Sequence, residues 1–317
     1  MKDVKNANYI QKDNKIQIFK EDDVVILPSI EAYEIFEWSK TYFYSKPEEG
    51  YFIWVKSSPN HPLITNILAC SKQFDQNMIN LVIIEKDTQA KLYSKCVAIK
   101  QDLHGKHIGH TKIIVKENAR IEINHIHRWG NGDTVDSSMD LVLKKGSEAS
   151  LVQKCHKVPM ELKLANNNYL EENSLLNYST TVLAEKGKVE MYDSTYLNGK
   201  RANGVSRVRM ICREKSRIKA RSKMIANNAG TGHLDCMGLL LAKDSNIIAI
   251  PELINSHKDA SLTHEASVGK ISDEVLNYLR SRGLTEDQAI DLVITGFLGE
   301  EENIVIDGSA ISSKLYM

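Results

Sequence analysis

A histidine and a glutamate stand side by side in the stretch LTHEASVG, as His264 and Glu265, and Cys236 precedes them. Thiolate suits softer metals and iron–sulfur clusters, and imidazole and carboxylate also bind iron. The sequence HEASV does not complete the HExxH motif of zinc proteases. On adjacency alone, a structural His-Glu pair is the more typical interpretation.

The residue numbers of Cys236 and Glu265 differ by 29, an interval that recurs in the middle of the chain. Six segments there share an apolar strand, a short polar turn and a second alternating strand. Aligned on the last strand residue before the turn, the segments give Ile84, Val115, Leu143, Leu183, Cys212 and Leu241. The successive differences in residue number are 31, 28, 40, 29 and 29. We interpret HKVPMELKLANNNYLEENS, within the longest interval, as an inserted loop.

The strands of these segments alternate apolar and polar residues, with Gly, Asn, Asp and Lys in the turns. Few helical patterns intervene, so a sheet of βαβ units fits poorly. A strand solenoid with coils of about 28–30 residues fits better, because stacked coils bury a continuous core. An antiparallel sandwich is the alternative that the pattern leaves open.

A solenoid would bring the residues that can do chemistry together. Residues one coil apart stack about 4.8 Å from each other in the backbone. The period therefore predicts that Cys236 lies directly below Glu265, with His264 one position away. Because adjacent strand residues point to opposite faces, His264 and Glu265 need a bulge or a strand end to act together.

Two other groups of histidines have weaker spacing. His104, His107 and His110 in DLHGKHIGH could line a metal site, but their glycine-rich context favours a solvated loop. His125 and His127 stand at i, i+2 on one strand face, which suits two metal ligands. That spacing suits an exposed polar face equally well, and we prefer the exposed face.

The five cysteines form no CxxC pair, so neither a disulfide framework nor a preformed four-cysteine zinc site is expected. Most of them are predicted to be small buried hydrophobes. Cys155, next to His156 at the start of the predicted inserted loop, is a candidate for a redox role. His233 and His257 are predicted to be surface residues.

The two ends of the chain differ from the repeats. Residues 29–45 and the stretch ITNILACSKQFDQ have helical patterns, and with IQIFKEDDVVIL they predict a small α/β cap. Near the other end, SDEVLNYLRSRG and TEDQAIDLVITGF predict two helices, the second opened by a capping box of Thr285 and Gln288. A strand-like tail, NIVIDG, follows. We expect a cap over residues 1–78, a core over residues 79–270 and a helical region over residues 271–317.

Composition excludes several classes of function. Lys+Arg and Asp+Glu balance at 41 each, which argues against a nucleic-acid or anionic-membrane partner. The apolar runs are too short to span a bilayer and no apolar signal segment is visible, so we expect a cytoplasmic protein. Neither GxxxxGK[ST] nor GxGxxG occurs, and ATP hydrolysis is expected in a separate partner.

The C-terminal third resembles the signature region of the SufB/SufD proteins of iron–sulfur cluster assembly. The stretch that carries the resemblance begins at PELINSHKDAS and ends at DLVITGF. The matching positions are Pro251-Glu252-Leu253, His264, Ala266, Gly269-Lys270, Tyr278-Leu279, Arg282-Gly283, Ala289 and Gly296-Phe297. The resemblance implies a right-handed parallel β-helix core followed by a helical C-terminal region.

The resemblance also implies a scaffold protein rather than an enzyme. It implies an iron–sulfur cluster held transiently at Cys236, His264 and Glu265, and a sulfur donor for which Cys155 and Cys212 are candidate acceptors. The implied partners are an ABC-type ATPase, SufC, and a second SufB- or SufD-like subunit paired through the β-helix. Tyr278, Arg282, Gly283 and Phe297 would form the ATPase docking surface.

Within this resemblance, Glu265 favours a SufB-like character, because SufD proteins typically have glycine after the histidine. The chain is shorter than typical bacterial SufB, as in an archaeal or minimal form working as a homodimer. A SufD-like interaction subunit that carries no cluster is the first alternative. A β-helix enzyme acting on carbohydrate ranks last, because an aromatic content of 7% offers no clear stacking groove.

Overall fold

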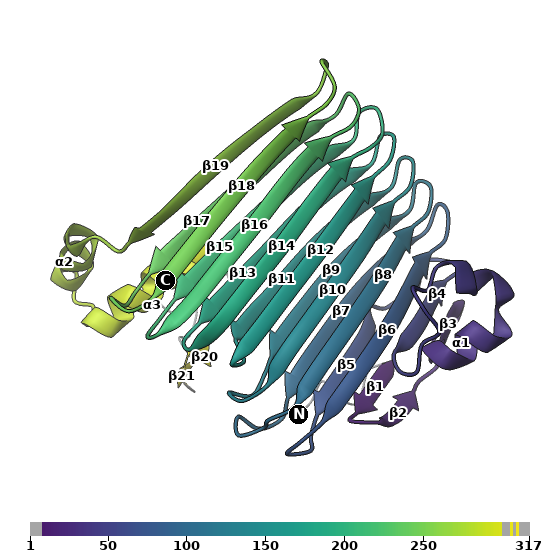
Figure 1. The fold of residues 1–317 in the computed structure, drawn as a ribbon, viewed down its shortest axis with the longest axis horizontal. Coiled ribbons are helices and arrows are strands. Elements are labelled where there is room, and N and C mark those ends of the chain that lie inside the picture. The colour runs from purple at the N-terminus through teal and green to yellow at the C-terminus, as the bar shows by residue number, and fades with distance from the viewer. Residues whose placement is uncertain (1–7, 300–304, 307–308, 311–317) are drawn as a thin grey trace.

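Two large β-sheets wind around one interior in a computed structural model that describes residues 8–299, 305–306 and 309–310. Figure 1 shows their strands stacked as the coils of a parallel β-helix, with helices at both ends of the stack. Within these two sheets, neighbouring strands are parallel except for the pairs β1–β2 and β3–β4. The predicted mainly β fold with a β-helix core is therefore confirmed.

Each full coil contributes one strand to each sheet, and from β4 to β19 consecutive strands alternate between the sheets. Sheet A contains β1 Tyr9–Lys12, β2 Lys15–Ile18, β5 Leu63–Ala69, β7 Gln89–Ala98, β9 Arg120–Arg128, β11 Glu148–Lys157, β13 Leu175–Ala184, β15 Asn203–Cys212, β17 Thr231–Leu240 and β19 Ser261–Lys270. Sheet B contains β3 Val24–Pro28, β4 Tyr51–Val55, β6 Asp75–Ile84, β8 Lys106–Val115, β10 Thr134–Leu143, β12 Glu161–Leu170, β14 Gly187–Leu197, β16 Ser216–Ala226 and β18 Asn246–Asn255.

The turns from sheet B to sheet A stack as regularly as the strands do. Asp87, Asn118, Gly146, Asn173 and Arg201 occupy the same turn position in successive coils, with φ between 56° and 70°. Asn, Asp and Gly tolerate this left-handed conformation best. The backbone N–H of Asp87 donates to the carbonyl of Glu117 in the next coil at 3.0 Å. The polar turns that punctuate the sequence therefore bond the coils to one another.

The predicted alignment of the repeats matches the strand pairing as far as Leu143. The next aligned residue lies in the other sheet. Ile84 pairs with Val115, and Val115 pairs with Leu143, all in sheet B. Leu143 next pairs with Leu170 of β12, whereas Leu183 lies on β13 of sheet A. The prediction of an inserted loop was wrong, because this interval contains a regular strand, β12.

The reason for that error is a polar interior. Asn166 and Asn168 of β12 point inward, where they are 2% and 1% exposed. The Asn166 side chain donates to Asp193 at 2.8 Å, and that of Asn168 donates to Thr195 at 3.2 Å. Because each buried amide has a partner on the next coil, a strand rich in asparagine fits inside the solenoid.

The N-terminal segment covers the outer side of sheet B at the first coils. Helix α1, Ser29–Ile35, and the 3₁₀ helix η2, Glu37–Thr41, fall within the predicted helical range 29–45. A second helix predicted for ITNILACSKQFDQ was wrong, because Leu63–Ala69 is strand β5. Its alternating residues pack into the core and it pairs in parallel with β7. Parallel pairing thus begins within residues 1–78, and the predicted domain boundaries stay a prediction.

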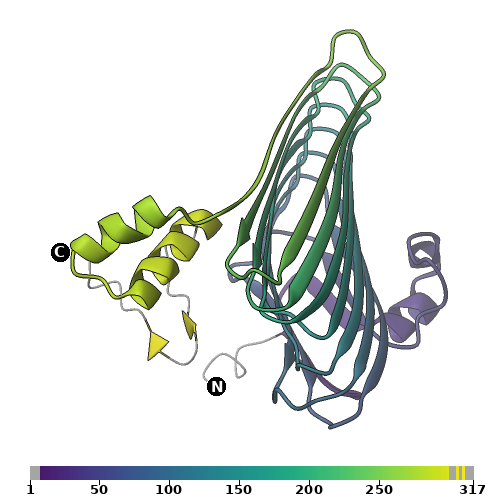
Figure 2. The ribbon, with the colours of Figure 1, turned by 60° about the vertical axis from the view of Figure 1, so that its left-hand side comes forward.

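Two helices follow the last strand of sheet A and lie beside the final coils (Figure 2). Helix α2 is Asp273–Ser281 and helix α3 is Glu286–Leu298, as the sequence predicted. The predicted capping box of Thr285 and Gln288 opens α3. The helix packs on the outer side of sheet A in a cluster that contains Leu183, Ile211, Leu239, Ile294 and Leu298.

Within the predicted tail NIVIDG, the described part is β20, Val305–Ile306, which pairs with β21, Ser309–Ala310. The other residues of that stretch lie outside the described residues. In the described part of the chain, neither the length nor the apolarity of any helix is sufficient to cross a membrane.

Candidate functional site

Cys236 lies inside the solenoid, one strand from its end. Its side chain belongs to the main core cluster, and the residue is 1% exposed. Burial raises the pKa of the Cys236 thiol to about 11, and the nearby Ser222 hydroxyl offsets part of that rise. The thiol is therefore protonated at neutral pH unless a cation replaces the proton.

The register of β17 against β19 corrects the predicted stacking. Cys236 pairs with Ala266, not with Glu265. The prediction assumed a constant coil length, but Val208 pairs with Cys236 and Cys236 pairs with Ala266, so the residue number advances by 28 and then by 30. A period that varies by one residue reverses the face on which a stacked side chain lies.

His264 and Glu265 therefore lie on opposite faces. The pairing of β17 with β19 continues through both residues without a bulge. His264 pairs with the inward-pointing Leu234 and lies on the same face as Cys236, two positions along the strand. Strand spacing and rise per residue place the Cα atoms of Cys236 and His264 roughly 8 Å apart. The structure brings His264, but not Glu265, to the Cys236 face.

Glu265 lies on the outer face, beside a charged pair on the neighbouring strands. It pairs with Asp235, which accepts from the Arg209 guanidinium at 2.9 and 2.5 Å. That guanidinium lies 6.0 Å from the ring centroid of Phe297 on α3. The Arg209 and Asp235 side chains are only 17% and 10% exposed, so the outer face carries a partly buried ion pair under the helix.

A buried carboxylate stands on the inner side of the same coils. Asp193 is 2% exposed, and its Oδ1 accepts from Asn166 and Tyr178. Its Oδ2 has no hydrogen-bond partner among the described residues. Burial raises the pKa of Asp193 to about 6, and its negative charge raises the pKa of Cys236 in turn. Sequence analysis did not single out Asp193, because an isolated aspartate in a strand gives no signal of its own.

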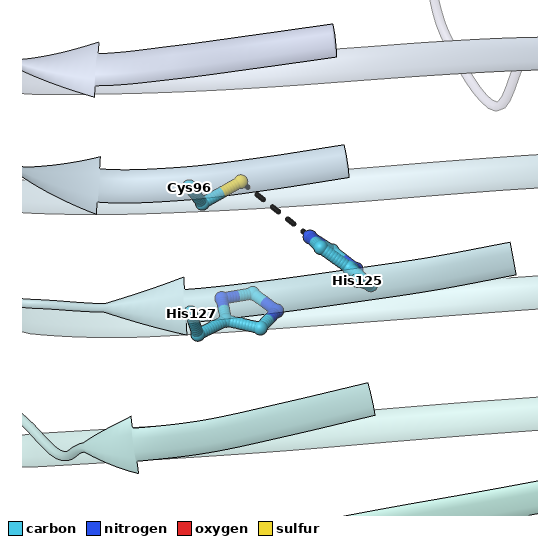
Figure 3. A group of neighbouring side chains, drawn as sticks. All are labelled: Cys96, His125 and His127. Carbon is cyan, nitrogen blue, oxygen red and sulfur yellow. Dashed lines mark hydrogen bonds between the residues drawn. The ribbon is translucent and has the colours of Figure 1, made fainter. Parts of the chain in front are cut away.

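A second group of side chains that carry potential metal-ligand atoms lies in the earlier coils. Cys96 on β7 and His125 and His127 on β9 each offer one ligand atom, and these atoms lie within 4.8 Å of one another (Figure 3). All three side chains are buried, with His127 0% exposed. The preferred prediction of an exposed histidine face was therefore wrong. The sequence did contain the signal, because both histidines share their strand parity with the apolar Ile121 and Ile123.

Burial sets the protonation of this group. It raises the pKa of Cys96 to about 12 and lowers the pKa of His125 to about 4. The pKa of His127 is lowered well below its usual value, by burial first and then by the neighbouring imidazoles. The ring of His127 accepts from the Trp129 indole at 3.3 Å and contacts the Gln153 amide at 3.3 Å.

The first histidine group also differs from its prediction. His107 is on β8, 2% exposed, with its Nδ1 3.0 Å from the Gln76 side chain. His110 lies on the same strand, 2.6 Å from the Ser138 hydroxyl. The predicted solvated loop was wrong for these two histidines, because the strand extends from Lys106 to Val115.

Comparison with known proteins identifies the family. Residues 67–297 match the SufBD core domain of the SUF system for iron–sulfur cluster assembly. The chain belongs to the SufBD family. As a SufBD protein it is an iron–sulfur cluster assembly protein, as the sequence resemblance indicated.

Archaeal SufBD proteins align with most of the chain. An iron–sulfur cluster assembly SufBD family protein of Archaeoglobus fulgidus is 29% identical, over 94% of this chain and 85% of its own length. A homologue from Methanothermobacter thermautotrophicus is 28% identical, over 78% of this chain and 62% of its own. A SufBD family protein from Pyrococcus horikoshii is 26% identical, over 91% of this chain and 63% of its own length. The chain therefore spans less than two thirds of the latter two relatives.

Within the SufBD fold, the predicted ATPase-docking residues have different environments. Tyr278 on α2 is 57% exposed, and the Arg282 guanidinium lies 5.2 Å from its ring centroid. Gly283 has φ +94°, which closes the link between the helices. Phe297 packs against the outer face of sheet A instead. The two suggested sulfur-receiving cysteines, Cys155 and Cys212, are both 0% exposed.

Proposed function

We propose that this SufBD chain is a scaffold on which iron–sulfur clusters are built, with Cys236 and His264 holding the nascent cluster at the open end of the solenoid. The observation that carries the proposal is their common face: His264 lies on the uncovered strand, and Cys236 lies one strand further in. Thiolate and imidazole together suit iron in a sulfur-containing cluster. The chain itself catalyses no separate reaction in this proposal.

The last coil is accessible to cargo. β19 ends sheet A, and no described strand pairs with its other edge. All its residues except Leu262 are exposed, His264 and Glu265 among them. Glu265 sits at the rim of this edge on the outer face, where it would capture iron before transfer to the inner face. Iron binding would replace the proton of the Cys236 thiol, whose pKa of about 11 keeps the free thiol protonated.

An ABC-type ATPase of the SufC class is the proposed partner at the C-terminal helices. Every residue of α2 is at least partly exposed, including Val275 at 44% and Tyr278 at 57%. Only two residues separate the end of β19 at Lys270 from the start of α2 at Asp273. Movement of α2 by the docked ATPase would therefore act directly on the strand that carries His264.

A second SufB- or SufD-like subunit would complete the scaffold by covering the last coil. The free edge of β19 and the exposed apolar Ile254 and Val268 on the last two strands support pairing through the β-helix. A sulfur donor supplies the remaining cargo. Neither nucleic acid nor membrane enters this proposal, since a formal net charge of zero favours neither.

The test is anaerobic reconstitution of the full chain with iron, sulfide and the partner ATPase. We expect Cys236→Ala to lose most of the cluster absorbance and of the transfer to an apo-acceptor, and His264→Ala to weaken both. Cys70→Ala is the matched control, because Cys70 is a partly exposed cysteine at the other end of the fold. Unchanged assembly and transfer by Cys236→Ala would sink the assignment.

A SufD-like interaction subunit is the second candidate function. The observation in its favour is that Glu265 lies on the face opposite Cys236, so the full set of three ligands does not meet in one chain. This chain would then hold the ATPase and a cluster-bearing relative without carrying a cluster. Stable co-purification with both partners, together with unchanged assembly by Cys236→Ala, is the result that this alternative predicts.

A further inference from the structure

Cys96, His125 and His127 form a compact group in the interior, far along the stack from the proposed cluster site. His125 and His127 point inward from alternate positions of β9. Cys96, on the adjacent rung β7, pairs with His127. Figure 3 shows the three side chains converging between the two strands. Two rigid strands therefore fix all three donors, a precise support for a ligand set.

The distances fit a tetrahedral metal ion. Cys96 Sγ and His125 Nε2 are 3.5 Å apart. Zinc bonds of about 2.3 Å to sulfur and about 2.0–2.1 Å to nitrogen, at a tetrahedral angle, place these atoms about 3.6 Å apart. The remaining ligand atom also lies within 4.8 Å of the other two. Closing the group around one ion would draw these atoms together and require a ring nitrogen of His127 to give up its contact with Trp129 or Gln153.

The chemistry of the group favours an ion over the hydrogen bonds alone. A thiol is a weak donor and a weak acceptor, so the Cys96–His125 contact does little to offset burial of these polar atoms. The two imidazole rings lie tilted against each other, with their centroids 4.1 Å apart and their planes at 40°. Bound metal would convert the thiol to a thiolate.

We propose that Cys96, His125 and His127 bind one zinc-class divalent cation inside the solenoid, separate from the cluster site. The mixed sulfur and nitrogen donors select zinc, cobalt or iron(II) over magnesium or calcium. A small anion such as hydroxide takes the fourth position and balances the remaining charge. Because the group is enclosed, the ion enters as the chain folds. Its role is to fasten the early coils to one another.

Cobalt is the probe, because thiolate ligation gives it a charge-transfer band in the near ultraviolet. The full chain is produced in cells grown with cobalt in place of zinc, and its metal content and absorption spectrum are measured. We expect one cobalt per chain, the charge-transfer band and the strong visible bands of four-coordinate cobalt. Cys96→Ser should abolish the charge-transfer band, and His127→Gln should lower the metal content at least tenfold.

Cys236→Ser is the matched control, and it separates this proposal from the proposed function. It should keep the cobalt and the band even though it loses cluster assembly. A chain without cobalt, a spectrum without the charge-transfer band, or a band abolished by Cys236→Ser would each overturn the metal site. Zinc-edge X-ray absorption of the wild-type chain tests the same site without any variant. One sulfur at about 2.3 Å from zinc, with nitrogen at about 2.0–2.1 Å, supports the site. Zinc without a sulfur ligand overturns it.

Discussion

Two groups of cysteine and histidine occupy one solenoid, and their places in the stack separate them. Cys96, His125 and His127 lie on β7 and β9, with β5 and β11 paired on either side. Cys236 and His264 lie on β17 and β19, and β19 has no described strand beyond it. The same strand geometry thus gives a closed group in the early coils and an open one in the last coil.

Position along the repeat determines what a side chain can do. In the closed group, burial keeps the imidazoles neutral and the thiol protonated, so these donors either bond to one another or take up an ion. In the open group, His264 and Glu265 are exposed and can meet cargo or a second subunit.

The largest expected effect is the loss of folding stability in acid, caused by the buried histidines of the early coils when no metal is bound. The pKa of His125 is about 4 in the folded chain against 6.5 when unfolded. Between these values the unfolded state binds more protons, so stability is lost as pH falls from 6.5 to 4, by about 3 kcal/mol from this residue. His107, with a pKa of about 3, adds a loss of the same sign. Urea unfolding at a series of pH values measures the loss.

His125→Gln isolates this effect from groups of opposite sign. Asp193 has its pKa raised to about 6, so it adds stability as pH falls through that value. Its contribution cancels when wild type and His125→Gln are compared. The destabilisation caused by the substitution should shrink by about 3 kcal/mol between pH 7 and pH 4. A difference that does not change with pH would show that His125 is not buried as a neutral ring.

The ion pair under α3 should give the next largest effect. Asp235→Ala leaves the Arg209 guanidinium partly buried without its carboxylate, which should cost about 2–3 kcal/mol. Asp136→Ala is the matched control, because the bridge from Asp136 to Lys163 is 44% and 49% exposed. Exposed bridges contribute about 0–1 kcal/mol. Equal losses in thermal or urea unfolding would contradict a protected outer face at the last coils.

Two valines on one interior row compare the closed and open regions directly. Val182, Met210, Gly238 and Val268 stack in register on successive strands of sheet A. Val182 is 0% exposed and Val268 is 42% exposed. Val182→Ala should cost about 2 kcal/mol, from lost burial and a small cavity. Val268→Ala should change the free energy of unfolding by less than about 0.5 kcal/mol, unless a second subunit covers this side chain.

The alternation of apolar and polar residues predicted most strands and the solenoid, and helical spacing with a capping box predicted both C-terminal helices, because each depends on local periodicity. It failed at β12, where paired asparagines replace apolar side chains inside the coil. It failed also at β5, where a short apolar run was read as helix. In both places, contacts with neighbouring coils decide the structure, and a single strand's sequence does not display them.

The role of the candidate site residues stays a prediction, and their predicted register was wrong. The family signature led to Cys236 and His264, and the structure places them on one face. Glu265 was assigned to the wrong face, since the residue number advances by 28 and then by 30 over the last two coils of sheet A, and a uniform period hides that difference. Strand parity could have revealed the buried histidines of β9. Cys96 lies on the adjacent strand β7. Its position beside the histidines follows only from the pairing of β7 with β9.

The smallest predicted effect tests whether the two regions are energetically separate. Thr285→Ala removes the capping box of α3 and should cost about 1 kcal/mol locally. In a solenoid each coil contacts mainly its neighbours, so the loss should stay near the helix. Amide exchange should become roughly fivefold faster in α3, with a smaller rise in β17, which packs against it through Leu239. Exchange in β7 and β9 should not change. Faster exchange around Cys96 would mean that the open end and the closed interior unfold as one unit, and that cargo binding at the last coil is sensed throughout the stack.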